Sequence, residues 1–321
     1  MNKPIVIVIG GPTASGKSNL AVELAKKING EIISADSMQI YKDMNIGTAK
    51  ITKKEMQNIK HYMIDFLSPN KRYSVSEYKR DAEKCIDEII KKGKTPIICG
   101  GTGLYIDSLI YNIEFSDEEI DETYRNKLNE IAEKEGLEKL YEEALKIDPE
   151  AMEKISKNDK KRIIRVLEIY HKTGKTKTQQ NIESRKNEVK YNYKVFAINI
   201  DREKLYNRIN SRVNQMISQG LIEEVENILD KYKEFPTAMQ GLGYKEVVEY
   251  LNKNISKEEM IEKIKMETRR YAKRQITWFK KNKEICWLNR WRGNREKYKY
   301  NKRFIWRRIT LIECKQKESK K

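Results

Sequence analysis

Cysteine is scarce in this 321-residue chain, which contains only four. Cys85, Cys99, Cys286 and Cys314 lie far apart and form no Cys-x-x-Cys pair, so the sequence predicts neither a zinc site nor a disulfide framework. Long hydrophobic runs are also lacking, because no segment approaches the roughly 18 apolar residues that a membrane-spanning helix requires. The first residues lead straight into a strand-like segment and lack the pattern of a signal peptide. We therefore expect a cytoplasmic protein that does not enter membranes.

Acidic residues are outnumbered, with 48 Asp and Glu against 66 Lys and Arg, and the formal net charge is +18. Such an excess favours a polyanionic partner such as nucleic acid, although basic composition alone is weak evidence for one. More than half of the excess lies in residues 290–321, where thirteen basic and three acidic residues give a net charge of +10. This basic tail is compatible with an RNA-binding extension, a disordered arm or the product of a shifted reading frame.

Short apolar runs that end at glycines predict the fold class. Pro4–Ile9 is β-branched and ends at Gly10, and Thr95–Cys99 leads into a second glycine-rich loop at residues 100–103. Runs of this kind are typical of central strands in a parallel sheet. Further strands are predicted at Glu31–Ser34 and Lys194–Ile200, and a helix at Ser18–Ile28. The sequence therefore predicts an α/β fold, a P-loop NTPase-like parallel sheet flanked by helices, with its site at the carboxyl edge.

The pattern changes to charged, amphipathic helical sequence between about Phe115 and Arg185, where apolar residues recur at three-to-four-residue spacing. The residues that show this spacing are Ile163, Val166, Leu167 and Tyr170. We predict four parts: a first P-loop core segment at residues 1–114, a mostly helical insert at 115–190, a second core segment with C-terminal helices at 191–289, and the basic tail at 290–321.

The strongest single motif is the phosphate loop that follows the first predicted strand. It consists of Gly11, Pro12, Thr13, Ala14, Ser15, Gly16, Lys17 and Ser18. The spacing Gly-x-x-x-x-Gly-Lys-Ser, between a strand and a helix, predicts a loop whose N–H groups surround a pyrophosphate or polyphosphate. Lys17 adds a positive charge, and the Ser18 hydroxyl can bind Mg²⁺. The motif does not identify a reaction, because kinases, ATPases and GTPases share it.

Asp36 follows the second predicted strand and is expected at the same edge of the sheet as the phosphate loop. A carboxylate there can bind Mg²⁺ or accept a proton from an incoming nucleophile. An isolated Asp at this place is also a common helix cap or turn former. The residues alone leave these roles open.

Six segments together resemble the bacterial tRNA dimethylallyltransferases, also called tRNA isopentenyltransferases. They are GPTASGKS (11–18), ISADSMQIYKDMNIGTAK (33–50), ICGGTGLYI (98–106), NDKKRIIRVLE (158–168), QGLGYKE (240–246) and TRRYAKRQITWF (268–279). The resemblance extends in order from residue 4 to about residue 289, and the combination is specific even though single segments are not. The basic tail has no counterpart in the family, and with Cys314 as its one cysteine it does not match the zinc finger of animal and fungal relatives.

The resemblance implies transfer of the dimethylallyl group from dimethylallyl diphosphate to N6 of the adenosine immediately 3′ of the anticodon in tRNA. The phosphate loop then holds the diphosphate of the donor, with Lys17 and a Mg²⁺ ion at Ser18 stabilising the pyrophosphate that leaves. The position of Asp36 matches the residue that accepts the N6 proton. Thr102 matches a threonine near the reacting centre, although a turn residue after two glycines is a simpler interpretation.

The resemblance also implies contacts with the anticodon stem-loop, whose target adenine must be unstacked at a cost of a few kcal/mol. The predicted tRNA-binding residues are Asp36, Ser37, Met38, Gln39, Thr102, Lys161, Arg162, Arg165, Lys273 and Arg274. Gln39 has the donor and acceptor groups for recognising a base edge, whereas Arg162 and Arg165 can equally belong to a solvated helix face.

Family members lead us to expect a monomer without an obligate protein partner. Three alternative functions remain open. Two are enzymes, a P-loop kinase of nucleotides or small metabolites and a prenyltransferase of free adenine nucleotides. The third is a non-enzymatic RNA-binding protein with a degenerate phosphate loop.

Overall fold

The computed structural model of the chain describes residues 3–115 and 121–289, so the basic tail at 290–321 lies outside the described residues. The chain divides into two compact units. The core unit comprises the residues up to Asp107 and those from Tyr191, and the insert unit comprises Ser108–Lys190. The sequence predicts an insert that starts at residue 115, whereas the compact unit starts at Ser108, inside a helix that runs over Gly103–Ile110.

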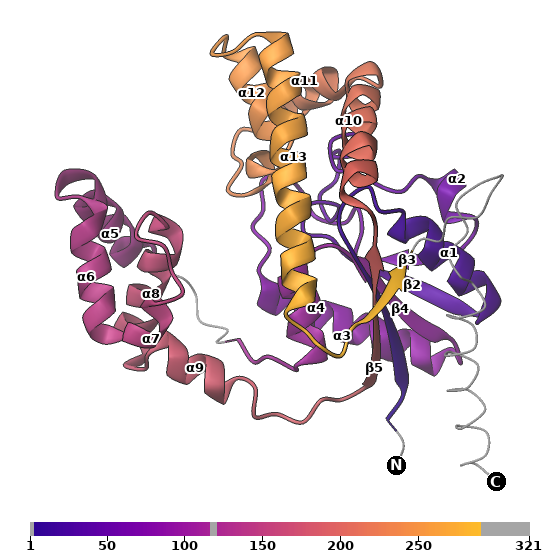
Figure 1. Cartoon of the computed structure of the whole chain (residues 1–321), viewed down its shortest axis with the longest axis horizontal. Coiled ribbons are helices and arrows are strands. Elements are labelled where there is room, and N and C mark those ends of the chain that lie inside the picture. The colour runs from indigo at the N-terminus through magenta and orange to yellow at the C-terminus, as the bar shows by residue number, and fades with distance from the viewer. Residues whose placement is uncertain (1–2, 116–120, 290–321) are drawn as a thin grey trace. The chain divides into compact units, whose positions relative to one another are not determined.

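The core unit contains one sheet of six parallel strands, in the order β3-β2-β4-β1-β5-β6 (Figure 1). The strands are β1 (Ile5–Gly10), β2 (Gly30–Ala35), β3 (His61–Tyr62), β4 (Thr95–Gly100), β5 (Asn192–Asn199) and β6 (Cys286–Asn289). The parallel α/β fold predicted from the sequence is confirmed. The two edge strands β3 and β6 were not predicted, because each is too short to show a pattern of its own.

The strand order places the functional edge of the sheet at the end of β1. The chain leaves β1, forms β2 two positions away, and returns to β4 between them, whereas β5 lies on the other side of β1. Gly10 of β1 pairs with Gly100 of β4, which in turn pairs with Ala35 of β2. Ligands of open parallel sheets bind where the strand order reverses, at the carboxyl ends. The loops after β1, β2 and β4 therefore start side by side at that edge.

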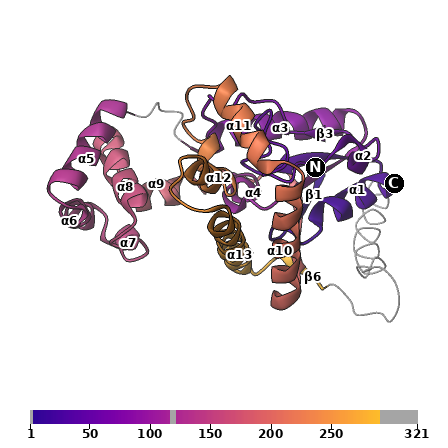
Figure 2. The ribbon, with the colours of Figure 1, turned by 90° about the horizontal axis from the view of Figure 1, so that it is seen from above.

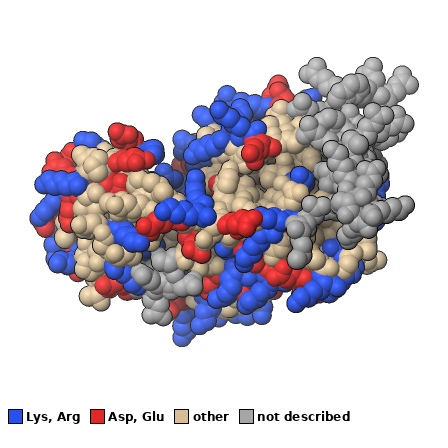
Figure 3. Space-filling model, turned by 90° about the horizontal axis from the view of Figure 1, so that it is seen from below, with Lys and Arg blue, Asp and Glu red and all other residues tan. Residues whose placement is uncertain are grey.

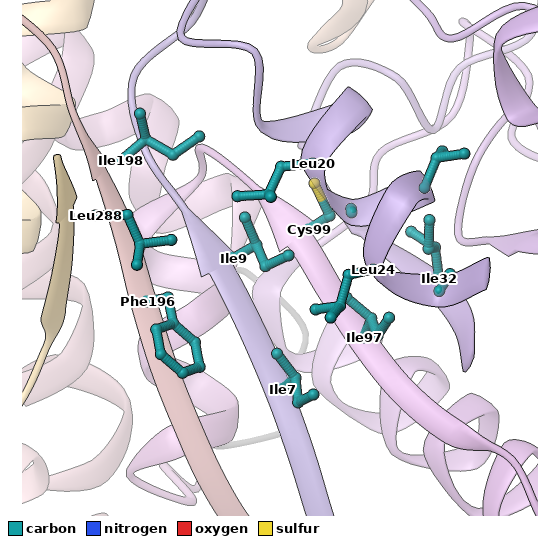
Figure 4. Close-up of a cluster of buried hydrophobic side chains, with 13 residues drawn as sticks. Ile7, Ile9, Leu20, Leu24, Ile32, Ile97, Cys99, Phe196, Ile198 and Leu288 are labelled. Atoms are coloured by element: carbon teal, nitrogen blue, oxygen red, sulfur yellow. The ribbon is translucent and has the colours of Figure 1, made fainter. Parts of the chain in front are cut away.

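Both faces of the sheet are buried, which explains the continuous apolar strands. On one face, Ile7 and Ile9 of β1 and Ile97 of β4 pack against Leu20 and Leu24 of α1 (Lys17–Lys27), as Figure 4 shows. Val6 and Val8 alternate with these residues along β1 and are fully buried on the opposite face. α3 (Val75–Lys91) covers β2 and β4, and its Tyr78 hydroxyl donates to the carbonyl oxygen of Ser34 at 3.1 Å.

A group of helices from the second core segment lies over the carboxyl edge of the sheet (Figures 1 and 2). The group consists of α10 (Arg202–Ser218), α11 (Leu221–Lys231), the 3-10 helix η1 (Ala238–Gln240), α12 (Tyr244–Leu251) and α13 (Lys257–Lys280). α10 and α13 pack against each other, and α12 packs against α13. Two other core helices are α2 (Lys53–Met56) and the start of α4 (Gly103–Ile110). No helix of the described residues is long and apolar enough to cross a membrane.

The insert unit is helical, as the sequence predicted. Its helices are α5 (Glu122–Lys134), α6 (Leu137–Ile147), α7 (Pro149–Met152), α8 (Lys160–Thr173) and α9 (Lys177–Glu183). Ile163, Val166 and Leu167 of α8 are buried in a cluster with Leu128 and Leu140. Tyr170, which shows the same spacing in the sequence, is instead 42% exposed. The Glu168 carboxylate on α8 is 7% exposed and pairs with arginines of α5 and α8.

Candidate active site

The phosphate loop leaves β1 with a backbone suited to binding an anion. Gly11, Ala14 and Gly16 have φ values of +148°, +59° and +88°, and the last of these directly precedes α1. α1 begins at Lys17 without a side-chain cap and without an acidic residue in its first turn. Its first N–H groups and the positive end of its dipole are therefore available to a phosphate.

Two cations line the cavity beside this loop. Lys17 lies at the start of α1 and donates to the carbonyl oxygen of Pro12 at 3.3 Å. Burial lowers the pKa of its ammonium group, against the opposing effects of Cys99 and Asp36. Arg212 reaches the same cavity from α10, and burial lowers the pKa of its guanidinium group. Two partly desolvated cations at one cavity make an anionic ligand favourable there.

Ser18 is half-buried in the first turn of α1 and is not among the residues that line the cavity. The described residues contain no group of three or more His, Cys, Asp or Glu side chains that could hold a metal ion. Mg²⁺ commonly binds through few protein ligands together with phosphate oxygens and water. The single hydroxyl of Ser18 beside a phosphate loop therefore fits a Mg²⁺ ion that is also bound by phosphate oxygens and water. The described residues do not offer a site in which protein side chains alone would bind the ion.

Asp36 follows β2 and forms a turn while keeping one oxygen available. Its Oδ1 accepts the N–H of Met38 at 3.0 Å and that of Gln39 at 3.3 Å. Its Oδ2 has no hydrogen bond within the described residues, and Asp36 lines the cavity with Lys17. A role as turn former and a role at the cavity, both left open by the sequence, are thus compatible, because the turn holds the carboxylate in a fixed orientation at the cavity.

Thr102 follows β4 and connects the loops after β2 and β4. Its Oγ1 accepts the N–H of Ser37 at 3.0 Å and lies 3.4 Å from the Ser37 Oγ, and its own N–H donates to the carbonyl oxygen of Ala35 at 3.1 Å. Thr102 is not among the residues that line the cavity, whereas Ser37 is. The threonine therefore acts on the cavity through the residue next to Asp36.

Gln39, a predicted base-recognising residue, uses its amide nitrogen within the protein. Its Nε2 donates to the carbonyl oxygens of Thr48 and Ala49 at 3.1 and 3.3 Å. These contacts hold the segment that follows Gly47, which lines the cavity together with both acceptor residues. Only the amide oxygen of Gln39 is left for a base edge in this conformation.

The cavity at the carboxyl edge has a volume of about 260 Å³ and lies entirely within the core unit. Its polar lining includes Thr13, Lys17, Asp36, Ser37 and Arg212. Its apolar lining comes from the helices above the sheet and includes Ile209, Val213, Met216 and Ile264. A cavity with both linings suits a ligand that carries an anionic group and an apolar chain.

α13 packs its C-terminal half onto three glycines of the carboxyl edge. A Cβ atom at Gly10 would lie 2.5 Å from the Phe279 ring, and one at Gly103 would lie 2.3 Å from Trp278. Gln275 approaches Gly101 in the same way. Tyr271, one turn earlier, lines the cavity; burial raises the pKa of its phenol to about 12, and the charge of Asp36 adds to this rise. The glycines of these loops are therefore required for the close approach of the helix.

The basic residues among those predicted to bind tRNA are exposed, whereas Met38 is half-buried and lines the cavity. Lys273 and Arg274 lie on α13 of the core unit, with the Arg274 guanidinium 5.8 Å from the centre of the Tyr271 ring. Lys161, Arg162 and Arg165 lie on α8 of the insert unit. On the face of the molecule in Figure 3, basic side chains are spread over both units with acidic ones among them.

The two arginines of α8 differ in their partners. Arg162 lies 3.4 Å from Asp159, the residue that caps the helix, whereas Arg165 lies 3.3 Å from the buried Glu168. Glu168 is held mainly by Arg125 of α5, through bonds of 2.5 and 3.0 Å. Neither exposed arginine is needed to neutralise a buried charge by itself.

Sequence reasoning missed four residues that organise the site, Arg212, Glu224, Tyr244 and Gln275. The Glu224 carboxylate on α11 accepts the N–H groups of Asn45, Ile46 and Gly47 at 2.9, 2.7 and 3.1 Å, and the Tyr244 hydroxyl at 2.7 Å. The segments that carry Tyr244 and Gln275 were noted for their resemblance, which could have directed attention to them. Arg212 and Glu224 lie in amphipathic helices without any such signal.

Comparison with known proteins identifies the family. The family model described as IPP transferase matches residues 39–282. The tRNA dimethylallyltransferase of Acetivibrio thermocellus is 53% identical over 286 residues, which cover 89% of this chain and 91% of that protein.

Two solved structures are also similar. That of the tRNA isopentenylpyrophosphate transferase of Bacillus halodurans has 39% identity and a TM-score of 0.66, over 90% of each chain. That of a eukaryotic dimethylallyltransferase acting on tRNA has 31% identity and a TM-score of 0.72, over 89% of this chain and 74% of the other. The phosphate loop, the cavity beside it and these matches lead to one conclusion: the chain belongs to the IPP transferase family.

Proposed function

We propose that this protein is a tRNA dimethylallyltransferase that transfers the dimethylallyl group of dimethylallyl diphosphate to N6 of the adenosine immediately 3′ of the anticodon. The observation that carries the proposal is that Lys17, Arg212 and the available oxygen of Asp36 share one cavity with apolar side chains. The cationic side of the cavity suits a diphosphate and its apolar side suits a dimethylallyl chain, so a prenyl diphosphate has a partner for both linings. The curated and structural relatives, all named as tRNA prenyltransferases, support the same reading.

In the proposed reaction the N6 amine attacks C1 of the dimethylallyl group while the C1–O bond to the diphosphate breaks. Pyrophosphate leaves with the bonding electrons, and the N–H groups of the phosphate loop, Lys17 and Arg212 stabilise its charge. Asp36 takes the proton that N6 loses as the new N–C bond forms. Thr102 keeps the loop of Ser37 and Asp36 in place through the Ser37 N–H.

Mg²⁺ is proposed as the metal cofactor, with Ser18 as its protein ligand. When bound, the ion would neutralise part of the charge on the diphosphate. Removal of divalent ions with a chelator, followed by addition of Mg²⁺ or Ca²⁺, tests this assignment separately from the identity of the substrates. Transfer that continues unchanged in excess chelator would remove Mg²⁺ from the proposal.

The partner is the tRNA anticodon stem-loop. Gln39, Met38 and Ser37 would contact the target base or its neighbours, and the exposed cations of α8 and α13 would contact phosphates. The helical insert at 115–190 would contact the tRNA through α8. Since its substrate is tRNA, we expect the enzyme in the cytoplasm, and we expect a monomer by analogy with its family.

The assay for this proposal uses labelled dimethylallyl diphosphate with three samples: tRNA, free AMP and no acceptor. We expect label on tRNA alone. Label on AMP but not on tRNA would indicate a prenyltransferase of free nucleotides. A parallel incubation with labelled ATP tests the kinase alternative, and label transfer from ATP to an added nucleotide or metabolite without prenyl transfer would contradict the proposal.

A further inference from the structure

The side-chain amide of Gln275 joins the two glycine-rich loops of the candidate active site. Its Oε1 accepts the N–H of Thr13 at 2.8 Å, and its Nε2 donates to the carbonyl oxygen of Gly101 at 3.0 Å. Thr13 belongs to the phosphate loop after β1, whereas Gly101 immediately precedes Thr102 in the loop after β4. One residue of α13 therefore spans the loop for the donor and the loop that orients Ser37 and Asp36.

The surroundings of Gln275 leave little freedom for this bridge. Its side chain is 5% exposed, so water competes weakly for either hydrogen bond. A Cβ atom at Gly101 would lie 2.2 Å from Nε2, which leaves no room for any other residue at that position while the bridge is intact. Trp278 and Phe279, on the next turn of α13, hold the helix close to Gly103 and Gly10. The Gln275 amide is thus fixed by its two hydrogen bonds and by the close packing of α13 on the glycines of both loops.

Glutamine is the side chain that fits the chemistry of this bridge. It offers an acceptor and a donor at the end of two methylene groups, whereas ionised glutamate offers only acceptors and asparagine is one methylene shorter. A purely apolar contact would hold the loops together but would leave the Thr13 N–H and the Gly101 carbonyl without partners.

We infer that Gln275 is a positioning residue of the transfer reaction, one that sets the phosphate loop at a fixed distance from the loop of Thr102. The inference rests on the proposed function. The first loop holds the diphosphate to which the donor carbon is attached, and the second loop orients the proton acceptor Asp36 through Ser37. An error of about 1 Å between reacting groups can cost on the order of 100-fold in rate. Loss of the bridge should therefore slow the chemical step more than it weakens donor binding.

The first test compares Gln275→Met with the matched control Gln215→Met, which makes the same change at an exposed position of α10. With tRNA and donor both saturating, Gln275→Met should lower the single-turnover rate about 10- to 100-fold, while the donor KM changes by less than about threefold. The control should react at the wild-type rate. A folded Gln275→Met variant with a wild-type rate would overturn the inference.

The second test separates positioning from general loss of stability by a double-mutant cycle. Gly101→Ala alone should slow transfer, because the added methyl group displaces the Gln275 amide. In a Gln275→Ala background the methyl group has space, so Gly101→Ala should cost far less there. Equal rate losses in the two backgrounds would contradict the bridge, whatever the stability of the single variants.

The outcome for the wild-type protein separates this inference from the proposed function. Wild-type protein that never labels tRNA contradicts the proposed function itself. Wild-type protein that labels tRNA, together with additive effects at residues 275 and 101, contradicts only the positioning role.

Discussion

The hydroxyl of Thr102 accepts the N–H of Ser37 at 3.0 Å, a contact that ties the loop after β4 to the loop after β2. Thr102→Val keeps the shape of the side chain and removes the acceptor. Because one hydrogen bond contributes about 1 kcal/mol, we expect this change to lower the rate of prenyl transfer by roughly fivefold to tenfold. Thr102→Ser retains the hydroxyl and should keep most of the activity. Equal rates for the Val and Ser variants, measured by single turnover, would show that the contact has no part in transfer.

Asp36 holds a turn and is also our proposed acceptor of the N6 proton, and substitution can separate these two roles. Asp36→Asn keeps an Oδ1 acceptor for the N–H groups of Met38 and Gln39 but cannot take a proton. We predict a loss of about 100-fold or more in the single-turnover rate, the usual range for removal of a general base, with little change in Tm. Asp36→Ala should lower both the rate and Tm, since it also removes the turn. A near-normal rate for Asp36→Asn would exclude proton transfer to this residue.

The cations of the cavity should govern donor affinity and its dependence on pH. Lys17 has a pKa below the ordinary lysine value because it is buried. Its charge is present at low pH and is lost as pH rises through that lowered pKa, so donor affinity should fall at alkaline pH, earlier than for an exposed lysine. Arg212→Gln should raise the donor KM at every pH. Lys17→Arg keeps its charge at alkaline pH, and an unchanged pH profile for that variant would contradict the assignment.

Glu224 supports the segment of Gly47 that lines the cavity. Glu224→Gln replaces one acceptor oxygen by a donor that faces backbone N–H groups, so we expect a loss of about 1–3 kcal/mol in the free energy of unfolding. Such a loss corresponds to a fall of several degrees in Tm for a protein of this size. Glu223→Gln, at the exposed neighbouring position, is the control and should change Tm little. Equal Tm values for the two variants would show that the hydrogen bonds of Glu224 do not stabilise the fold.

The arginines of α8 should contribute to tRNA binding through phosphate contacts. The double variant Arg162→Gln, Arg165→Gln should weaken binding and reduce the slope of log K against log salt by about one unit per lost contact. The donor KM should remain unchanged. Lys134→Gln, on α5 of the same unit and largely exposed, provides the charge-matched control for one substitution. A double variant with the wild-type salt slope would place both arginines on a solvated helix face.

The strands and the phosphate loop could be predicted because their signals are local. Buried parallel strands show as continuous β-branched runs, and the loop has fixed spacing between a strand and a helix. The contact between Thr13 and Gln275 spans 262 positions in the chain and depends on the packing of α13 over the sheet, which no local pattern encodes. In the sequence, Arg212 does not differ from other cations of amphipathic helices, and only the packing of α10 places it at the cavity. No local pattern shows that the amide nitrogen of Gln39 donates to the carbonyl oxygens of Thr48 and Ala49, so the sequence alone favours a role in base recognition.

A single-turnover reaction with two tRNAs that differ in one nucleotide tests the proposed transfer to N6 most directly. One carries adenosine immediately 3′ of the anticodon, and the other carries guanosine there, which has no N6 amine. After incubation with dimethylallyl diphosphate, the digested nucleosides are identified by mass spectrometry. We expect N6-dimethylallyl adenosine from the first tRNA and no prenylated nucleoside from the second. Prenylation of both tRNAs, or of neither, would contradict the proposed function.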